Sequence, residues 1–123
     1  MRIFLDTSIL SDARLPAVSD EIVKHRLAGD EFYLSVITHF QVLWGYLAAG
    51  LSTDRYERLL EVAEIGIAPL TRLDVETAAG LKPSKRDMLD ALIAATAKRY
   101  DAHVWTSDRD FLKFLPRTQT KLV

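Results

Sequence analysis

Short apolar stretches alternate along the chain with longer amphipathic ones. The short stretches have the length and composition of buried strands and end at Asp, Ser or Pro residues. They predict strands at Arg2–Leu5, Phe32–Ser35, Ile67–Leu70 and Ala102–Trp105, with Thr118–Val123 as an edge strand. The longer stretches place their apolar residues at helical spacing. They predict helices at Ala17–Leu27, Val36–Ala49, Asp54–Glu64, Asp74–Leu81, Arg86–Tyr100 and Asp108–Phe114.

Residues typical of helix ends mark several of these boundaries. Gly50 suits the C-terminal end of the second helix, and Ser52 or Thr53 suits the N-terminal end of the third. Asp74 is expected to cap the fourth helix, and 82–85 is expected to be a loop.

Strands that alternate with helices favour an α/β fold with a parallel sheet. We therefore expect a single domain over residues 1–123, with a short central parallel β-sheet flanked by helices on both faces. Sheets of this kind bind ligands beyond the carboxyl ends of their strands.

The composition is that of a globular protein. The chain has 123 residues, of which 49% are hydrophobic and 27% are charged, which excludes a disordered chain, a collagen-like repeat and a coiled-coil rod. The absence of cysteine excludes a disulfide scaffold, a thiolate nucleophile and Cys-ligated zinc. The longest apolar run, Ala91–Ala95, is far shorter than a membrane span, and the N-terminus shows no secretory signal, so we expect a cytoplasmic protein without membrane association.

Three aspartates occupy positions where a parallel sheet presents a binding site. Asp6 directly follows the first strand, Asp108 follows the fourth, and Asp90 lies in the first turns of an apolar helix. Each could be a turn or helix-capping residue when considered alone. Together they are expected to converge at one edge of the sheet. Hard cations such as Mg²⁺ or Mn²⁺ prefer such oxygen ligands, and the cluster suits metal-assisted phosphodiester hydrolysis.

Three stretches of the chain resemble the motifs of PIN-domain ribonucleases, in particular VapC-type toxins of toxin–antitoxin pairs. They are Phe4–Leu10 at the start, Asp90–Ala97 in the central helix and Thr106–Phe111 near the end, and their order also fits. The resemblance implies a PIN fold, hydrolysis of RNA with Mg²⁺ or Mn²⁺ as cofactor, and an antitoxin protein as partner.

The resemblance also implies roles for individual residues. Asp6, Asp90 and Asp108 would be the catalytic metal ligands, and Asp110 would be a further acidic group near the metal. The side chains expected to hold carboxylates or water in place by hydrogen bonds are Thr7, Ser8 and Thr106.

The stretch from Thr38 to Gly45 resembles the family pattern Thr-x-x-Glu-Leu-x-x-Gly but departs from it in one chemically important way. Gln41 stands where the family has glutamate, and Val42, also apolar, stands where it has leucine. An amide offers a neutral oxygen and cannot act as a general base. Three explanations are open: Gln41 orients a metal-bound water, Asp87 or Asp110 supplies the missing charge, or catalysis is weakened and the chain is a binding protein.

Other catalytic arrangements find less support. The three histidines, His25, His39 and His103, lack metal-ligand spacing, and there is no P-loop or nucleophile elbow. A receiver domain would fit the length, but it needs a phospho-accepting Asp after a central strand, where this chain has Pro69 and Leu70.

The net charge of −1 results from nearly equal numbers of charged residues of each sign. The chain has sixteen basic and seventeen acidic residues, and its C-terminal half is locally basic. Such residues are either a solvated surface or contacts to RNA phosphates, for which the best candidates are Lys85, Arg86 and Arg109.

The helix from Val36 carries more apolar surface than a small sheet can cover. Trp44, Tyr46 and Leu47 either pack in the core or form a homodimer interface or an antitoxin-binding groove.

Overall fold

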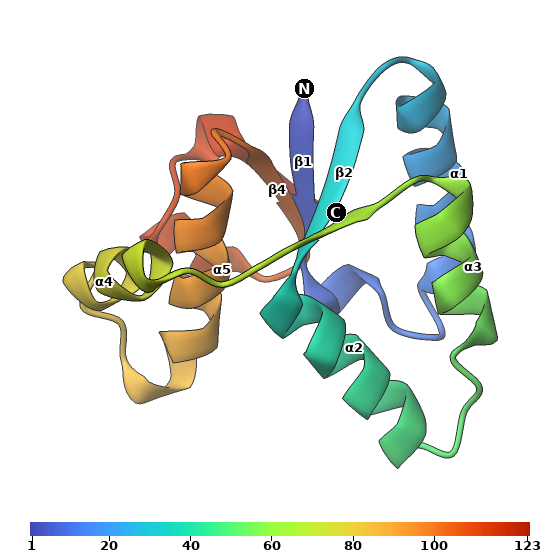
Figure 1. Cartoon of the computed structure of the whole chain (residues 1–123), viewed down its shortest axis with the longest axis horizontal. Coiled ribbons are helices and arrows are strands. Elements are labelled where there is room, and N and C mark those ends of the chain that lie inside the picture. The colour runs from blue at the N-terminus through green and yellow to red at the C-terminus, as the bar shows by residue number, and fades with distance from the viewer.

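Five parallel strands form one sheet in a computed structural model that describes residues 1–123. The strand order is β3-β2-β1-β4-β5, so β1 is central (Figure 1). The strands are β1 (Arg2–Leu5), β2 (Glu31–Ser35), β3 (Gly66–Ala68), β4 (His103–Thr106) and β5 (Thr120–Leu122). Leu5, the last residue of β1, pairs with Trp105, so the carboxyl ends of β1 and β4 lie side by side.

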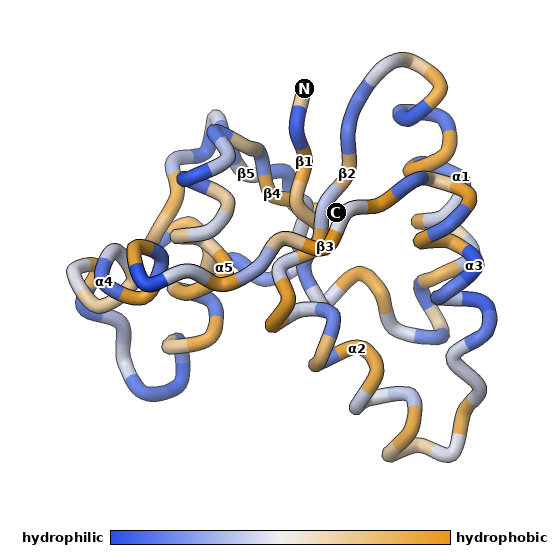
Figure 2. Tube along the Cα trace, viewed as in Figure 1, coloured by the Kyte–Doolittle hydropathy of each residue, from blue (hydrophilic) through white to orange (hydrophobic).

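Five α-helices and four short 3-10 helices connect the strands. The α-helices are α1 (Leu15–Leu27), α2 (Val36–Ala48), α3 (Asp54–Val62), α4 (Arg72–Gly80) and α5 (Met88–Arg99). The 3-10 helices are η1 (Thr7–Ile9), η2 (Lys85–Asp87), η3 (Arg109–Lys113) and η4 (Arg117–Gln119). The loop that leads from α4 toward α5 is the hydrophilic segment at the lower left of Figure 2.

The helices cover both faces of the sheet. Helices α1 and α3 lie on one side of the strands and α4 and α5 on the other, while α2 extends beyond the end of β2 (Figure 1). This architecture confirms the predicted α/β fold.

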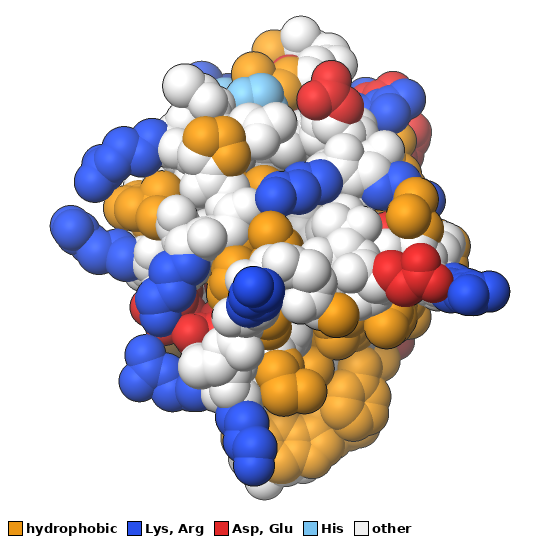
Figure 3. Space-filling model, turned by 90° about the vertical axis from the view of Figure 1, so that its left-hand side faces the viewer, with side chains coloured by type: hydrophobic (Ala, Val, Ile, Leu, Met, Phe, Trp, Pro, Cys, Tyr) orange, Lys and Arg blue, Asp and Glu red, His pale blue; other side chains and the backbone are white.

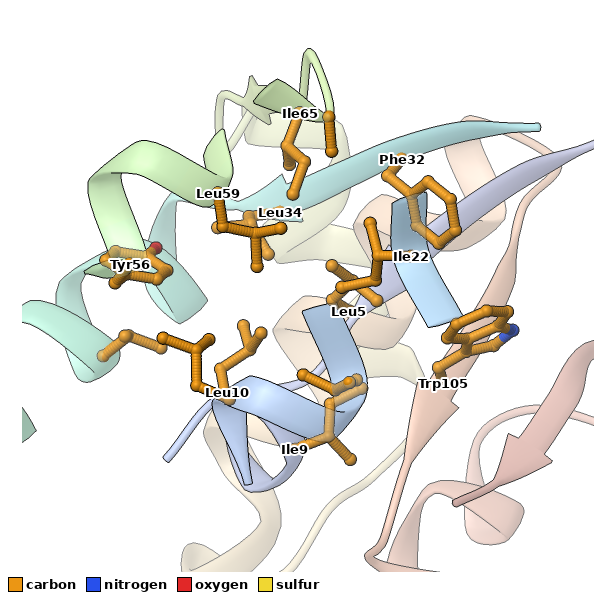
Figure 4. Close-up of a cluster of buried hydrophobic side chains, with 14 of the residues drawn as sticks. Leu5, Ile9, Leu10, Ile22, Phe32, Leu34, Tyr56, Leu59, Ile65 and Trp105 are labelled. Atoms are coloured by element: carbon orange, nitrogen blue, oxygen red, sulfur yellow. The ribbon is translucent and has the colours of Figure 1, made fainter. Parts of the chain in front are cut away.

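Two hydrophobic clusters form the core, one on each face of the sheet. Alternate residues of β1 separate them: Ile3 and Leu5 belong to the first cluster and Phe4 to the second. Figure 4 shows the first, in which Phe32 and Trp105 lie beside Ile22 of α1. The alternation follows from strand geometry, because successive side chains point to opposite faces.

A buried ion pair joins α4 to α5. The Asp74 carboxylate is 1% exposed and accepts hydrogen bonds from Arg99 Nε (2.9 Å) and Thr96 Oγ1 (3.2 Å). The Arg99 guanidinium and the Thr71 backbone hold the pKa of Asp74 below its ordinary value despite burial. Removal of one partner would leave a buried charge unpaired, so the pair holds α4 against α5.

The predicted cap of α4 was wrong. Thr71 is the N-cap, and Asp74 is the third residue of the helix, whose side chain accepts from the Thr71 backbone N–H. The two residues form a reciprocal capping box, so α4 begins at Arg72.

Other predicted boundaries shift by a few residues. Strand β3 ends at Ala68, immediately before Pro69, which cannot donate to a sheet. The helix expected from Arg86 begins as 3-10 helix η2, and the regular helix α5 starts at Met88. No helix in the structure combines the length and the hydrophobicity that crossing a membrane requires.

Candidate active site

The carboxyl ends of β1 and β4 bring two distant parts of the chain together. Asp6 follows β1, and its backbone N–H donates to Trp105 of β4 (3.0 Å). Its neighbour across the sheet is Thr106, the last residue of β4, whose hydroxyl donates to Asp6 Oδ2 (2.8 Å). The sequence-predicted residues Asp6 and Thr106 therefore meet directly.

The Asp6 carboxylate is oriented entirely through one oxygen. Oδ2 accepts from the Ser8 hydroxyl (2.7 Å), the Ser8 backbone N–H (3.4 Å) and the Thr106 hydroxyl. The side chain is 4% exposed, and Oδ1 accepts no hydrogen bond from the protein. One oxygen of a fixed carboxylate is therefore left for another ligand.

The same two hydroxyls also position the loop after β4. Ser8 Oγ accepts from the Ser107 backbone N–H (3.0 Å), and Thr106 Oγ1 accepts from that of Asp108 (2.9 Å). Asp108 in turn caps η3, since its Oδ1 accepts from the Asp110 backbone N–H (2.8 Å). Asp108 and Asp6 are thus held by one connected network.

Asp90 faces these carboxylates from the first turn of α5. Burial raises the pKa of Asp90 to about 7, helped by the negative charges of Asp6 and Asp108 and, less strongly, of Asp87 and Asp110. A carboxyl group with like charges nearby resists ionisation. Its raised pKa places all five acidic side chains in one electrostatic neighbourhood.

Two of the five aspartates are neutralised by basic side chains. Lys113 Nζ lies 3.0 Å from Asp87 and 3.2 Å from Asp110, and Arg86 also pairs with Asp110 (3.2 Å). Asp87 is only 3% exposed, and Lys113 together with the Ser84 hydroxyl holds the pKa of Asp87 below its ordinary value. Both carboxylates are therefore paired with basic side chains in this structure.

Asp6, Asp90 and Asp108 have no basic partner, and they are the three predicted metal ligands. Three unpaired carboxylates are a donor set that suits a hard divalent cation. No three His, Asp or Glu side chains, however, lie close enough together to share an ion in this structure. Bound Mg²⁺ would have to hold the three carboxylates together against their mutual repulsion.

Gln41 touches the site through Thr7. The Thr7 hydroxyl donates to Gln41 Oε1 (2.6 Å), which joins α2 to the turn that follows β1. His39, two residues before Gln41, binds the hydroxyl of Tyr56 through Nδ1 (2.8 Å) and thereby ties α2 to α3. The structure thus gives Gln41 a definite orientation and gives His39 a packing role.

A known family matches most of the chain. The family model described as "PIN domain" matches residues 3–114, which include every acidic side chain described above. The chain belongs to the PIN domain family. Comparison of this PIN domain with curated proteins gave no match.

Solved structures share the fold of this PIN domain. The chain is similar to a chain of VapBC2 from Rickettsia felis, solved with a promoter DNA fragment, with a TM-score of 0.75, 14% identity and coverage of 99% and 98% of the two chains. It is similar to a chain of a toxin–antitoxin complex from Klebsiella pneumoniae, with a TM-score of 0.65, 19% identity and coverage of 97% and 95%. For FitAcB from Neisseria gonorrhoeae the TM-score is 0.61, the identity 25% and the coverage 90% and 91%.

On one face of the PIN domain, several Lys and Arg side chains lie around an acidic patch at the left of the view (Figure 3). Lys85 and Arg109 are exposed and form no ion pair, whereas Arg86 is engaged with Asp110 and Asp87. Of the three predicted phosphate contacts, two are therefore free to meet a polyanion.

Sequence reasoning missed the part played by Lys113 and Ser84. Lys113 follows Asp110 by three residues, a spacing that favours a local pair, but its partner Asp87 lies 26 residues away. Only the fold of the PIN domain reveals the second contact.

Proposed function

We propose that this PIN domain is a Mg²⁺- or Mn²⁺-dependent endoribonuclease and the toxin of a toxin–antitoxin pair. The observation that supports this most is the division of the five aspartates: basic side chains neutralise Asp87 and Asp110, whereas Asp6, Asp90 and Asp108 stay unpaired. Three neighbouring carboxylates without basic partners repel one another and lower the stability of the fold. Their presence is therefore best explained by the binding of a cation.

Each part of the site has a role in the proposed reaction. A divalent ion on Asp6, Asp90 and Asp108 would activate water and stabilise charge on the phosphate. Ser8 and Thr106 fix the orientation of the Asp6 carboxylate, because their hydroxyls occupy Oδ2. Lys85 and Arg109 are placed to contact phosphates of the RNA backbone.

The proposed partners are a second copy of the chain and an antitoxin protein. Val36, Phe40, Trp44 and Leu47 form an exposed apolar ridge along α2, whereas Tyr46 is 5% exposed and belongs to the core. Two of the similar solved structures are described as toxin–antitoxin or VapBC assemblies, which supports a protein partner.

The Asp6→Asn variant tests the proposed function. We expect loss of metal-dependent RNA cleavage by at least about a hundredfold, because an amide cannot replace the charge of a ligand. The fold should persist, since Asn keeps an oxygen for the Ser8 and Thr106 hydroxyls.

Expression of the natural chain should arrest growth, and expression of Asp6→Asn should not. Undiminished cleavage by the variant would refute the assignment.

Gln41→Glu tests the alternative that this chain is a binding protein with weak catalysis. If the natural chain cleaves RNA in Mg²⁺, Gln41 permits catalysis. If the natural chain is inert and Gln41→Glu is active, the chain is a binding protein in its present form. Calorimetry with Mg²⁺ gives an independent measurement, since the binding protein need not take up the ion.

A further inference from the structure

A pocket of about 230 Å³ lies beside the acidic site, between α2 and the segment after β1. Thr7 and Gln41 form the wall nearest Asp6. The volume is below the about 300–1,000 Å³ typical of sites for drug-sized ligands, so the pocket suits one planar ring system.

The floor of the pocket is apolar and fixed. Leu10, Val42 and Tyr46 are all buried, and the Tyr46 hydroxyl donates to the Leu10 carbonyl oxygen (2.8 Å). That hydrogen bond joins α2 to the segment after η1, so the two sides of the pocket hold a constant separation. An apolar floor that includes the aromatic ring of Tyr46 can accept the face of a base.

Two polar groups at the pocket are not used by the protein. Gln41 Oε1 is occupied by the Thr7 hydroxyl, which leaves the two N–H groups of Nε2 without a protein acceptor. Asp12 lines the pocket, is exposed, and has no ion-pair or hydrogen-bond partner. Its negative charge adds to the effect of burial in raising the pKa of Tyr46, so the carboxylate lies near the floor. The pocket therefore offers a donor and a charged acceptor.

Gly45 keeps the pocket open. A Cβ atom built on Gly45 meets no heavy atom within 4 Å, so the space next to this helical residue is empty. Because Gly45 lines the pocket, a larger side chain at this position would take up space in it.

We propose that this pocket binds one unpaired base of the RNA substrate, with guanine as the best match, an inference that rests on the proposed function. Bases of single-stranded RNA expose their Watson–Crick edge. Guanine presents a carbonyl oxygen for the Gln41 amide and two adjacent N–H groups for the Asp12 carboxylate. The proposal also accounts for glutamine at position 41, because a glutamate there could not donate to a carbonyl and would repel Asp12.

Cleavage of four short RNAs that differ in one base next to the cleaved bond tests the proposal. We expect the natural chain to favour one base by about tenfold or more in kcat/KM, in line with a bidentate base contact. In Gly45→Leu that preference should fall toward unity, because leucine fills the pocket. Leucine is a better helix former than glycine, so the variant should fold.

Gly80→Leu is the matched control. A Cβ atom at Gly80 also meets nothing within 4 Å, and Gly80 lies on α4, away from the pocket. The Gly80→Leu variant should therefore keep the base preference of the natural chain.

Nucleoside binding tests the pocket without catalysis or phosphate. Guanosine should shift the NMR signals of the Gln41 side-chain amide in the natural chain and leave them unchanged in Gly45→Leu. Asp12→Asn should weaken guanosine binding about tenfold while adenosine binding stays the same. Equal shifts with all four nucleosides, or none, would overturn the proposal.

The two measurements separate this inference from the proposed function. Guanosine binding in a chain that cleaves no RNA would retain the pocket and refute the nuclease. RNA cleavage whose base preference is unaffected by Gly45→Leu would retain the nuclease and refute the pocket.

Discussion

Asp90 carries the largest electrostatic cost in the candidate site. Its carboxyl group is partly buried near the unpaired carboxylates of Asp6 and Asp108, and its pKa rises from 3.8 to about 7. Since Lys113 and Arg86 are already engaged by Asp87 and Asp110, no basic side chain relieves this repulsion. A cation bound between these carboxylates would relieve this electrostatic strain.

This strain predicts a pH-dependent stability. Between about pH 4 and pH 7 the folded chain keeps a proton on Asp90 that the unfolded chain has lost, so Asp90 lowers the free energy of unfolding as the pH rises. We expect the loss to be on the order of 1–2 kcal/mol, less than the full shift converts to, because the side chain is partly exposed. Urea unfolding in EDTA from pH 4 to pH 8 measures it.

Asp90→Asn is the control for this measurement. The variant cannot ionise, so it should lack this contribution and be more stable than the natural chain above pH 7. Millimolar Mg²⁺ should flatten the profile of the natural chain, because an ion stabilises the charged carboxylates. Identical pH profiles of the two proteins in EDTA would show that Asp90 is not strained by its neighbours.

The sequence anticipated the acidic residues better than the residues that surround them. Asp6 and Asp108 were predictable because Asp6 directly follows an apolar strand and Asp108 comes within three residues of another, and strand ends are set by local pattern. Asp12 of the pocket was not, since an exposed aspartate after a turn carries no local signal. The contacts of Gln41 with Thr7 and of Lys113 with Asp87 depend on side chains far apart in the sequence.

At the scale of elements, α2 is the helix whose surface the fold leaves uncovered. It contains no charged residue, and its exposed face carries Val36, Phe40, Trp44 and Leu47. Figure 3 shows hydrophobic side chains gathered at the lower end of the molecule, at the height of α2 in Figure 1. An uncharged ridge can pack against its own symmetry copy without like-charge repulsion, which favours a second chain as its partner.

The ridge predicts a homodimer that two substitutions should dissociate. Phe40 and Trp44 are 68% and 65% exposed, so Phe40→Ser with Trp44→Ser should disturb the monomer little. We expect the natural chain to elute with the mass of two chains and the double variant with the mass of one, as measured by light scattering. Leu73→Ser with Val75→Ser on α4 serves as a control, because these exposed residues lie away from the ridge. A double α2 variant that stays dimeric would place the interface elsewhere.

The sequence predicted which segments are helices and which are strands more accurately than it predicted their first and last residues. The spacing of apolar residues identified all five strands and all five α-helices. The sixth predicted helix, Asp108–Phe114, is instead the 3-10 helix η3. The start of α4 was misjudged because Thr71 and Asp74 are both good capping residues, and only the reciprocal hydrogen bonds show which one precedes the helix. Similarly, Tyr46 and Trp44 look alike in an apolar helix, and contacts with other elements decide that Tyr46 is the buried one.

At the scale of the molecule, the net charge of −1 conceals a separation of charge. Unpaired Asp6 and Asp108 follow the carboxyl ends of β1 and β4, and Asp90 lies in the first turn of α5. Of the unpaired basic residues, Lys85 lies in η2, which leads into α5, and Arg109 is the first residue of η3. The parallel topology brings these segments to one edge of the sheet, although 85 and 109 are distant in sequence. A polyanionic substrate therefore meets basic side chains around an acidic centre that needs a cation.

This arrangement predicts how salt should affect RNA binding. In an Asp6→Asn background, which prevents cleavage, Lys85→Gln should reduce the slope of log affinity against log salt by about 0.7, the value for one phosphate contact with a single strand. The affinity difference should be largest at low salt and vanish at high salt. Lys24→Gln removes the same charge from an exposed position on α1, across the sheet, and should leave the slope unchanged. Fluorescence anisotropy measures these slopes. Equal slopes for both variants and the parent would show that the Lys85 side chain is solvated and makes no phosphate contact.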